Sequence, residues 1–429
     1  MLGSIVIVFV KQYFMHFYKT TGKYSYSKIT ILVFVISVLG NVCNYLLQLF
    51  AARFLSVEDY GLFNVGFSIT FPFFLIISPV QNYITKVLSS NIAHNIENYS
   101  FYTFLKIKLY KIIGIYTLVP ICLTFLIANF LDFDFSYSLI AVFFSIAVLP
   151  YFYDLSIIQS YHKIGLLAFS SFFAPFIKFT FCALAVFFTN SVFVAFISLL
   201  AGNFFLSLLF RYFTKDIIKI ENSSKKYYIK DAILYIIKSS LVYCIYALLQ
   251  YMDVMLVKYF CSLYDTGIYS SASVLGKAVI YLPSAMALIL FPAVTEENAQ
   301  GKSSFQLLIK SVGLNLFFSG GGALILFLSA KWIIPLFFGV KYMNAIPVIK
   351  YLGLAFMPLS MITIFFTFFL AKENFKCIFP MTLSVIVQFV LALFFHDTLL
   401  ELVFTFFISG LAGCLGFLGI YLVGVIKRS

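Results

Sequence analysis

The sequence predicts an all-α polytopic membrane protein with twelve transmembrane helices arranged as two six-helix lobes. Three observations lead to this fold class. The 429-residue chain is 62% hydrophobic and 10% charged, with a mean hydropathy of +1.03, whereas soluble domains carry about a quarter charged residues. Its apolar residues form runs of about the 20 residues that a helix needs to cross a bilayer. A motif in the first half of the chain returns 206 residues later, which indicates two related halves.

The predicted helices are the apolar runs between polar breaks. They are too long and too uniformly apolar for the strands of a membrane barrel, in which polar and apolar residues alternate. In chain order the predicted spans are 29–51, 61–85, 109–131, 136–158, 165–188, 191–212, 232–258, 267–291, 306–330, 345–370, 377–395 and 399–425. The corresponding divisions are an N-terminal cytoplasmic or interfacial segment (1–28), an N-lobe (29–212), a cytoplasmic linker (213–231), a C-lobe (232–425) and a tail (426–429).

The polar breaks account for the ends of these spans in order. Spans 1 and 7 follow lysine-bearing segments and end at the two copies of the repeated motif, from which spans 2 and 8 begin. Spans 3 and 9 follow breaks that contain Lys106 and Lys302, and spans 5 and 11 follow Lys163 and Lys376. Spans 4, 6 and 12 follow very short breaks, and span 10 follows a longer one that contains Lys341.

The basic residues predict the orientation. With the N-terminus placed inside, 22 lysines and arginines fall on the inner side, and five fall outside or at outer helix ends: Arg53, Lys258, Lys331, Lys341 and Lys350. Basic residues collect in cytoplasmic loops, so we expect both termini to be cytoplasmic. The same rule accounts for the net charge of +13 without a nucleic-acid partner. The opening run "MLGSIVIVFV" lacks the leading charges of a signal peptide. It is either an interfacial segment or upstream of a true start at Met15.

The repeated motif reads "RFLSVEDYGLF" from Arg53 and "KYFCSLYDTGIY" from Lys258. Three matching pairs stand out: Ser56 with Ser262, Asp59 with Asp265, and Gly61 with Gly267. Each Ser-x-x-Asp is typical of a helix N-terminal cap, with the carboxylate near the positive helix end. Each glycine allows a neighbouring helix to approach closely. A catalytic pair at Glu58 and Asp59 is the weaker interpretation, because the repeat explains Asp59 without chemistry.

The linker divides the spans six and six, so the two halves share one orientation and are related by a pseudo-two-fold axis along the membrane normal. Polar residues recur at helical spacing on four of the predicted spans. They are Ser37, Asn41, Asn44 and Gln48 on span 1; Asn64, Ser68, Ser78, Asn82 and Thr85 on span 2; Ser239, Tyr243, Tyr246, Gln250 and Asp253 on span 7; Ser270, Ser273, Lys277, Tyr281 and Ser284 on span 8. One such stripe usually joins helices. Four that coincide under the repeat favour a cavity between the lobes.

Four ionisable residues lie well within the predicted spans: Asp154, Lys178, Asp253 and Lys277. Two interpretations stay open. Lys178 and Lys277, with Arg53 above them, make the cavity cationic for a phosphate-bearing substrate; or Lys277 only neutralises Asp253. A direct pair between Asp154 and Lys178 is doubtful on depth. Asp253 and Asp154 are candidates for coupling to an ion gradient.

Three stretches carry a family resemblance. "YMDVMLVKYFCSLYDTGIYSSASVLGKAVIYLPSAMALILFPAV" (251–294), "FLSVEDYGLF" (54–63) and "PLFFGVKYMNAIPVIKYLG" (335–353) resemble the polysaccharide-biosynthesis (O-antigen) flippase family of the MATE-like exporter superfamily. The resemblance implies two lobes in a V around a central cavity. It implies that an undecaprenyl-pyrophosphate-linked oligosaccharide moves from the inner to the outer leaflet of the bacterial cytoplasmic membrane by alternating access. The bilayer and other polysaccharide assembly proteins are the implied partners. The related peptidoglycan-precursor flippases typically carry two further helices.

Two other function classes are weighed beside this one. A drug or cation antiporter of the same fold would prefer an acidic, aromatic cavity, and Lys178 and Lys277 argue against it. A membrane polymerase or glycosyltransferase would need a catalytic subdomain, but "DFD" (Asp132–Asp134) and His396–Asp397 lie in short predicted outer loops. The sequence has no P-loop, and its seven cysteines are scattered without metal spacing. We therefore expect a transporter without catalytic residues, metal or cofactor.

Overall fold

The computed structural model describes residues 26–93, 129–131, 134–161, 163–215, 229–281, 290, 293–294, 297, 304–372 and 374–426. Helices dominate this part of the chain. The first half contains α2 (Tyr26–Phe54), α3 (Val57–Ala93), α5 (Phe135–Ser160), α6 (Ile164–Thr189) and α7 (Val192–Thr214). The second half contains α8 (Ile229–Phe260), α9 (Leu263–Gly276), α11 (Phe305–Phe337), α12 (Ile346–Ala371), α13 (Ile378–Phe394) and α14 (Leu399–Ile426), with 3₁₀ turns η2 (Val340–Ala345) and η3 (Phe375–Cys377). Most of the predicted span 109–131 and the end of span 267–291 lie outside the described residues.

The helices have the length and surface of membrane spans. Among the described residues, eight helical segments are long and apolar enough to cross a bilayer. Their outward faces carry large exposed apolar side chains, including Phe188, Phe317 and Trp332, each more than 70% exposed. An apolar surface of this extent is incompatible with water and is covered in a lipid bilayer.

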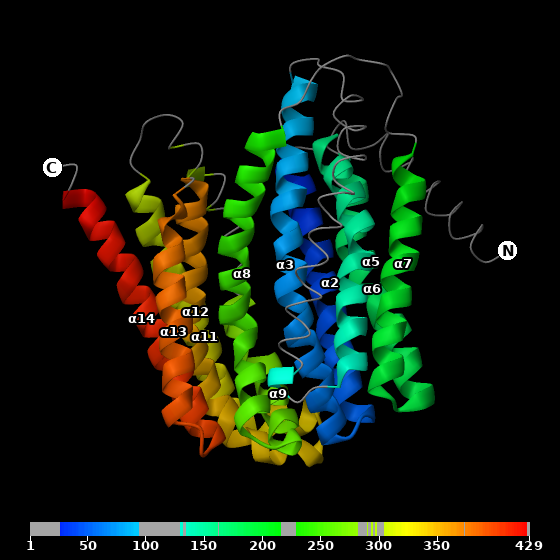
Figure 1. The fold of residues 1–429 in the computed structure, drawn as a ribbon, viewed down its shortest axis with the longest axis vertical. Coiled ribbons are helices and arrows are strands. Elements are labelled where there is room, and N and C mark those ends of the chain that lie inside the picture. The colour runs from blue at the N-terminus through cyan, green and yellow to red at the C-terminus, as the bar shows by residue number, and fades with distance from the viewer. Residues whose placement is uncertain are drawn as a thin grey trace.

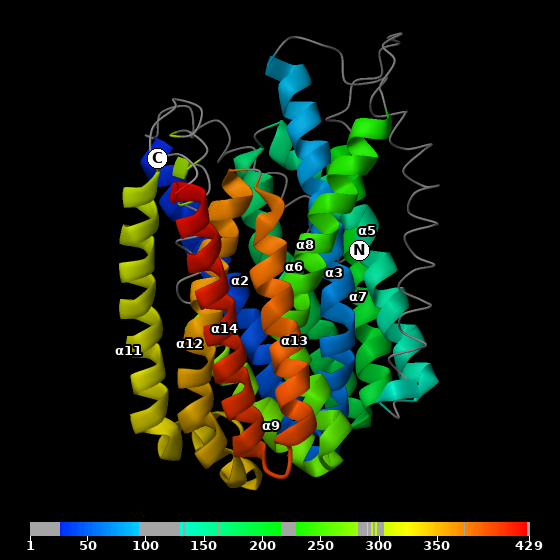
Figure 2. The same cartoon turned by 60° about the vertical axis from the view of Figure 1, so that its left-hand side comes forward.

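The two halves pack in the same way. Within the first half, α2 packs on α6, α3 on α5, and α7 on both α5 and α6. Within the second half the equivalent pairs recur: α8 packs on α13, α9 on α12, and α14 on both α12 and α13. Between the halves, α3 contacts α8 and α9. Figures 1 and 2 show the first half, blue to green, beside the second, green to red.

The two copies of the repeated motif cap helices at one end of the molecule. Ser56 Oγ accepts a hydrogen bond from the Asp59 N–H at 3.0 Å, and Ser262 Oγ accepts one from the Asp265 N–H at 3.1 Å. The Ser262 hydroxyl also donates to Asp265 Oδ2 at 2.6 Å. Both turns lie at the bottom of Figure 1. We call this the motif end, formed by residues 52–61, 258–267 and 336–345.

The lobes meet closely at the motif end through two glycines. A Cβ on Gly267 would lie 1.9 Å from the Val57 carbonyl oxygen, and one on Gly61 would lie 2.9 Å from the Gly267 nitrogen. Real Cβ atoms do not approach so closely, so this crossing of α3 and α9 requires glycine at both positions. Gly61 and Gly267 occupy equivalent positions in the two halves, so the crossing lies on the pseudo-two-fold axis that relates them.

A third glycine sets the packing inside the N-lobe. A Cβ on Gly40 would lie 2.0 Å from the Ser171 carbonyl oxygen on α6. We expect Gly40→Ala to lower the free energy of unfolding by about 2 kcal/mol, because overpacking a tight contact costs about 1–3 kcal/mol. Gly321→Ala is the matched control, since nothing lies within 4 Å of that Cβ. Thermal unfolding of the two purified variants in detergent measures the difference, and equal melting temperatures would contradict it.

A cavity between the lobes

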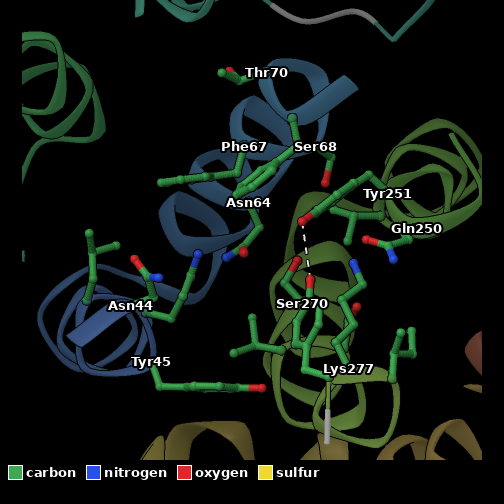
Figure 3. Close-up of a pocket in the computed structure, with 18 of the residues that line it drawn as sticks. Asn44, Tyr45, Asn64, Phe67, Ser68, Thr70, Gln250, Tyr251, Ser270 and Lys277 are labelled. Atoms are coloured by element: carbon green, nitrogen blue, oxygen red, sulfur yellow. Dashed lines mark hydrogen bonds between the residues drawn. The ribbon is translucent and has the colours of Figure 1, made fainter. Parts of the chain in front are cut away.

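A cavity of about 570 Å³ lies between the two lobes. Its walls come mainly from α2 and α3 on one side and from α8 and α9 on the other, with single contributions from α5, α6 and α7. Of the predicted cavity residues, those that line it are Asn41, Asn44, Gln48, Lys178, Tyr246, Gln250 and Lys277. Figure 3 shows Asn44 and Asn64 on the N-lobe side facing Gln250, Ser270 and Lys277 on the C-lobe side.

Residues at equivalent positions in the two halves lie on opposite walls of the cavity. Asn44 and Gln250 both line the cavity, as do Asn64 and Ser270, and the members of each pair are 206 residues apart. Ser270 Oγ has no hydrogen-bond partner in the described part of the structure. A buried hydroxyl that faces a cavity in this way can bind water or a polar ligand.

The amides on the walls are held by their neighbours. Gln48 Oε1 accepts from the Tyr60 hydroxyl at 3.2 Å, and Asn64 Nδ2 donates to the Tyr60 carbonyl at 3.0 Å. On the other wall, Gln250 Nε2 donates to the Tyr246 hydroxyl at 2.5 Å, which in turn lies 3.0 Å from Thr363 Oγ1. These bonds fix the side-chain positions before a ligand arrives, which lowers the ordering cost of binding.

The sequence analysis missed the aromatic part of the cavity. Tyr45, Phe67, Phe71 and Tyr251 line it beside Tyr281. The Tyr251 ring stacks on Phe71 of the other lobe, with centroids 4.5 Å apart, and its hydroxyl lies 3.2 Å from the Tyr281 hydroxyl (dashed in Figure 3). Among 56 phenylalanines and 29 tyrosines, no pattern marks these few. The only aromatic residues of the cavity that the sequence indicated were Tyr246 and Tyr281, in the polar stripes of spans 7 and 8.

Lys277 pairs with Asp253 and also lines the cavity. Its Nζ lies 3.1 Å from Asp253 Oδ1, so the ion pair is present, and Ser273 donates to Asp253 Oδ2 at 2.6 Å. Asp253 is only 1% exposed and does not line the cavity, whereas Lys277 does. The ammonium also lies 4.7 Å from the centre of the Tyr251 ring. Lys277 therefore neutralises the buried carboxylate and still faces the cavity.

The charge that faces the cavity is positive. Lys178 of α6 lines it together with Lys277, and lies 5.9 Å from the Phe144 ring centre. No aspartate or glutamate is among the described residues that line it. In a site walled by protein and apolar rings, charges act over a longer range than in water. Both described charged side chains that line the cavity are therefore cationic, and one of them, Lys277, is paired with Asp253 behind the wall.

Asp154 lies elsewhere in the structure. It is fully buried between α5 and α7, where its Oδ1 accepts from the Thr214 hydroxyl at 2.7 Å and from Arg211 at 3.3 Å. A pair with Lys178 was predicted to be doubtful on depth, and the described partner of Asp154 is Arg211. Both coupling candidates, Asp154 and Asp253, are thus in ion pairs.

Arg53 lies outside the cavity. Its guanidinium donates to the carbonyl oxygens of Leu336 and Phe337 at the end of α11, with Nε 3.1 Å from Phe337 O. The sequence analysis had predicted it to lie above Lys178 and Lys277 as part of a cationic cavity. The helix end turns its side chain toward the C-lobe instead.

Two of the residues that suggested an enzyme, Asp134 and His396, have structural contacts. The carboxylate of Asp134 accepts from the Ser136 N–H at 2.9 Å and caps α5, and this bond holds the pKa of Asp134 below its usual value; Asp132 is outside the described residues. The His396 ring stacks on Phe260 at 4.3 Å. Among the described residues, no group of three histidines, cysteines or carboxylates could hold a metal ion.

No family model and no curated protein matches the sequence, but solved structures resemble the fold. An inward-facing multidrug resistance MATE family transporter of the MOP superfamily aligns with a TM-score of 0.70 and 12% identity, over 93% of this chain and 99% of that one. An outward-facing transporter of the same description aligns with a TM-score of 0.66 and 13% identity, over 95% of this chain and 98% of that one. The lipid II flippase MurJ, in an inward closed conformation, aligns with a TM-score of 0.65 and 16% identity, over 92% of this chain and 87% of that one. The predicted two-lobe MATE-like fold is confirmed.

Proposed function

We propose that this protein is a flippase that moves an undecaprenyl-pyrophosphate-linked oligosaccharide from the inner to the outer leaflet of the bacterial cytoplasmic membrane. The observation that carries the proposal is the cavity between the lobes, lined by amides, hydroxyls and aromatic rings with two lysines and no described carboxylate. Lysine binds phosphate as a point charge, and amides and hydroxyls are suited to sugar hydroxyls. A cavity that combines these polar and charged side chains with apolar ones, inside a bundle with an apolar outer surface, fits a polar head group with an apolar tail.

The proposed mechanism is alternating access. The lobes contact each other at the motif end, which the distribution of basic residues predicts to be the outer end; we propose that the cavity in this state opens to the cytoplasmic side. Rocking of the lobes about the cavity would then expose the head group to the outer leaflet. The MurJ likeness supports a lipid-linked substrate, and an ion gradient is the proposed driving force. The bilayer and other polysaccharide assembly proteins are the proposed partners.

A MATE-type drug or cation antiporter is the alternative, since multidrug transporters share the fold. The cavity argues against it, because an organic cation would meet two ammonium groups and no carboxylate among the described lining residues. Deleting the gene in its host separates the two functions. Loss of a flippase is expected to accumulate lipid-linked repeat units on the inner leaflet and to remove surface glycan, with drug sensitivity unchanged.

Complementation of that deletion connects the phenotype to the cavity. We expect Lys178→Gln to reduce surface glycan at least tenfold, because it removes one of two cations that face the head group. Lys331→Gln, an exposed lysine on α11, is the matched control and should restore glycan fully. Membrane levels of each variant are measured by immunoblot. A deletion strain with normal glycan and raised drug sensitivity would establish the antiporter instead.

A further inference from the structure

The end of α11 is completed by a side chain from the other lobe. The last four carbonyls of a helix have no donors within it. In α11, Ile334 O and Pro335 O accept from the N–H groups of Phe338 and Gly339, where Gly339 turns the chain at a φ of 97°. The next two carbonyls accept from Arg53 of the N-lobe.

The end of α2, in the N-lobe, is completed in the same way by side chains of the C-lobe. Its Ala51 O accepts from the Leu55 N–H at 3.0 Å, and Ala52 O accepts from the Tyr342 hydroxyl at 3.1 Å. Lys341 Nζ donates to Arg53 O at 3.2 Å and to Leu55 O at 2.5 Å. Each lobe therefore places a cation on the negative end of a helix in the other lobe, where positive charge is stabilising.

The repeat places a second contact opposite the first. With the 206-residue offset, Arg53 corresponds to Tyr259 and Leu336 corresponds to Phe130. Tyr259 and Phe130 stack across the lobes with ring centroids 4.3 Å apart and an interplanar angle of 2°. The same two positions thus join the lobes on both sides of the Gly61–Gly267 crossing, by charged hydrogen bonds on one side and by ring stacking on the other.

We propose that Arg53 and Lys341 form a reciprocal latch that holds the motif end closed and is released when the cavity opens there. Their four hydrogen bonds all join the N-lobe to the C-lobe, so separation of the lobes at this end breaks them together. Both cations are exposed at the surface, where water replaces a lost partner. The latch therefore favours closure but does not prevent opening. A buried ion pair, by contrast, would prevent it.

Distance measurements on the purified protein in nanodiscs test the latch. Spin labels are placed at Thr189→Cys and Asp397→Cys, exposed positions on the α6–α7 and α13–α14 turns, after replacement of the seven native cysteines. Both turns lie at the motif end (Figure 1). We expect Arg53→Gln and Lys341→Gln each to raise the ratio of open to closed forms about threefold, and the double variant about tenfold, since both act on the same separation.

Lys331→Gln is the matched control and should leave the ratio unchanged, because this lysine takes no part in the four bonds. An unchanged ratio in the double variant overturns the latch, and so does an equal shift in Lys331→Gln. The role of opening in transport rests on the proposed function, but the measurement uses no substrate. A shifted ratio in a protein that moves no oligosaccharide would uphold the latch and refute the flippase, so the two failures are distinguishable.

Discussion

Lys277→Ala is expected to abolish surface glycan display and to lower the free energy of unfolding by about 3 kcal/mol. The stability loss follows from Asp253, which is 1% exposed and would lose the ammonium 3.1 Å from its Oδ1. Removing one partner of a buried ion pair costs about 3–5 kcal/mol because the other charge is left uncompensated. Loss of transport follows separately, because the cavity loses one of its two cations. Glycan display and thermal unfolding of the purified variant measure the two effects.

A double variant separates these effects. Asp253→Asn with Lys277→Gln removes both charges, and its amides can still hydrogen-bond to each other and to Ser273. We expect this variant to recover stability to within about 1 kcal/mol of the wild type, because no buried charge remains. Transport should stay lost, since the cation that faces the cavity is still missing. Recovery of glycan display by the double variant would mean that Lys277 only neutralises Asp253, and would remove it from the substrate site.

Gly267→Ala is expected to prevent closure of the motif end and to reduce transport at least tenfold. The added Cβ would lie 1.9 Å from the Val57 carbonyl oxygen and 2.8 Å from Val57 Cγ1, and backbone atoms cannot move aside as a flexible side chain does. Overpacking of this kind costs about 1–3 kcal/mol, which here acts against the closed form. Each lobe should still fold, because pairs such as α2 with α6 in one lobe and α12 with α14 in the other pack within a lobe and do not involve this crossing.

The distance between labels at Thr189→Cys and Asp397→Cys reports this effect directly. Gly267→Ala should populate chiefly the longer distance, and Gly61→Ala should do so less, because its nearest contacts would be 2.9 Å. Gly313→Ala is the matched control, since nothing lies within 4 Å of that Cβ. A closed distance that is unchanged in Gly267→Ala would mean that the crossing adjusts without separating the lobes.

Much of the fold could be predicted because the bilayer imposes its own pattern. A helix that crosses lipid must satisfy its backbone internally, so each apolar run of sufficient length predicts one helix. For example, the span predicted to start at residue 399 corresponds to α14, which begins at Leu399. The span predicted to end at residue 370 corresponds to α12, which ends at Ala371. The repeat was equally visible, because the caps at Ser56 and Ser262 depend on residues only three positions apart.

The cavity was partly predictable for a related reason. Asn44, Gln250 and Lys277 were found because polar side chains are costly in lipid, so a polar stripe must turn toward protein or water. Aromatic side chains carry no such penalty. Phe71 and Tyr251 therefore looked like every other ring in the chain until the structure placed them on facing walls.

Local sequence thus determined the helices, their repeat, their caps and the polar faces, since each depends on neighbours within a few residues or on the fixed thickness of the bilayer. Tertiary structure alone decided the partners of Arg53, Asp154 and Lys341. Arg53 binds residues 283 and 284 positions away, Asp154 binds Arg211 and Lys341 binds the end of α2. A long charged side chain reaches several ångströms in any direction, so its partner is set by how helices distant in sequence come together, within a lobe for Arg211 and between the lobes for Arg53 and Lys341.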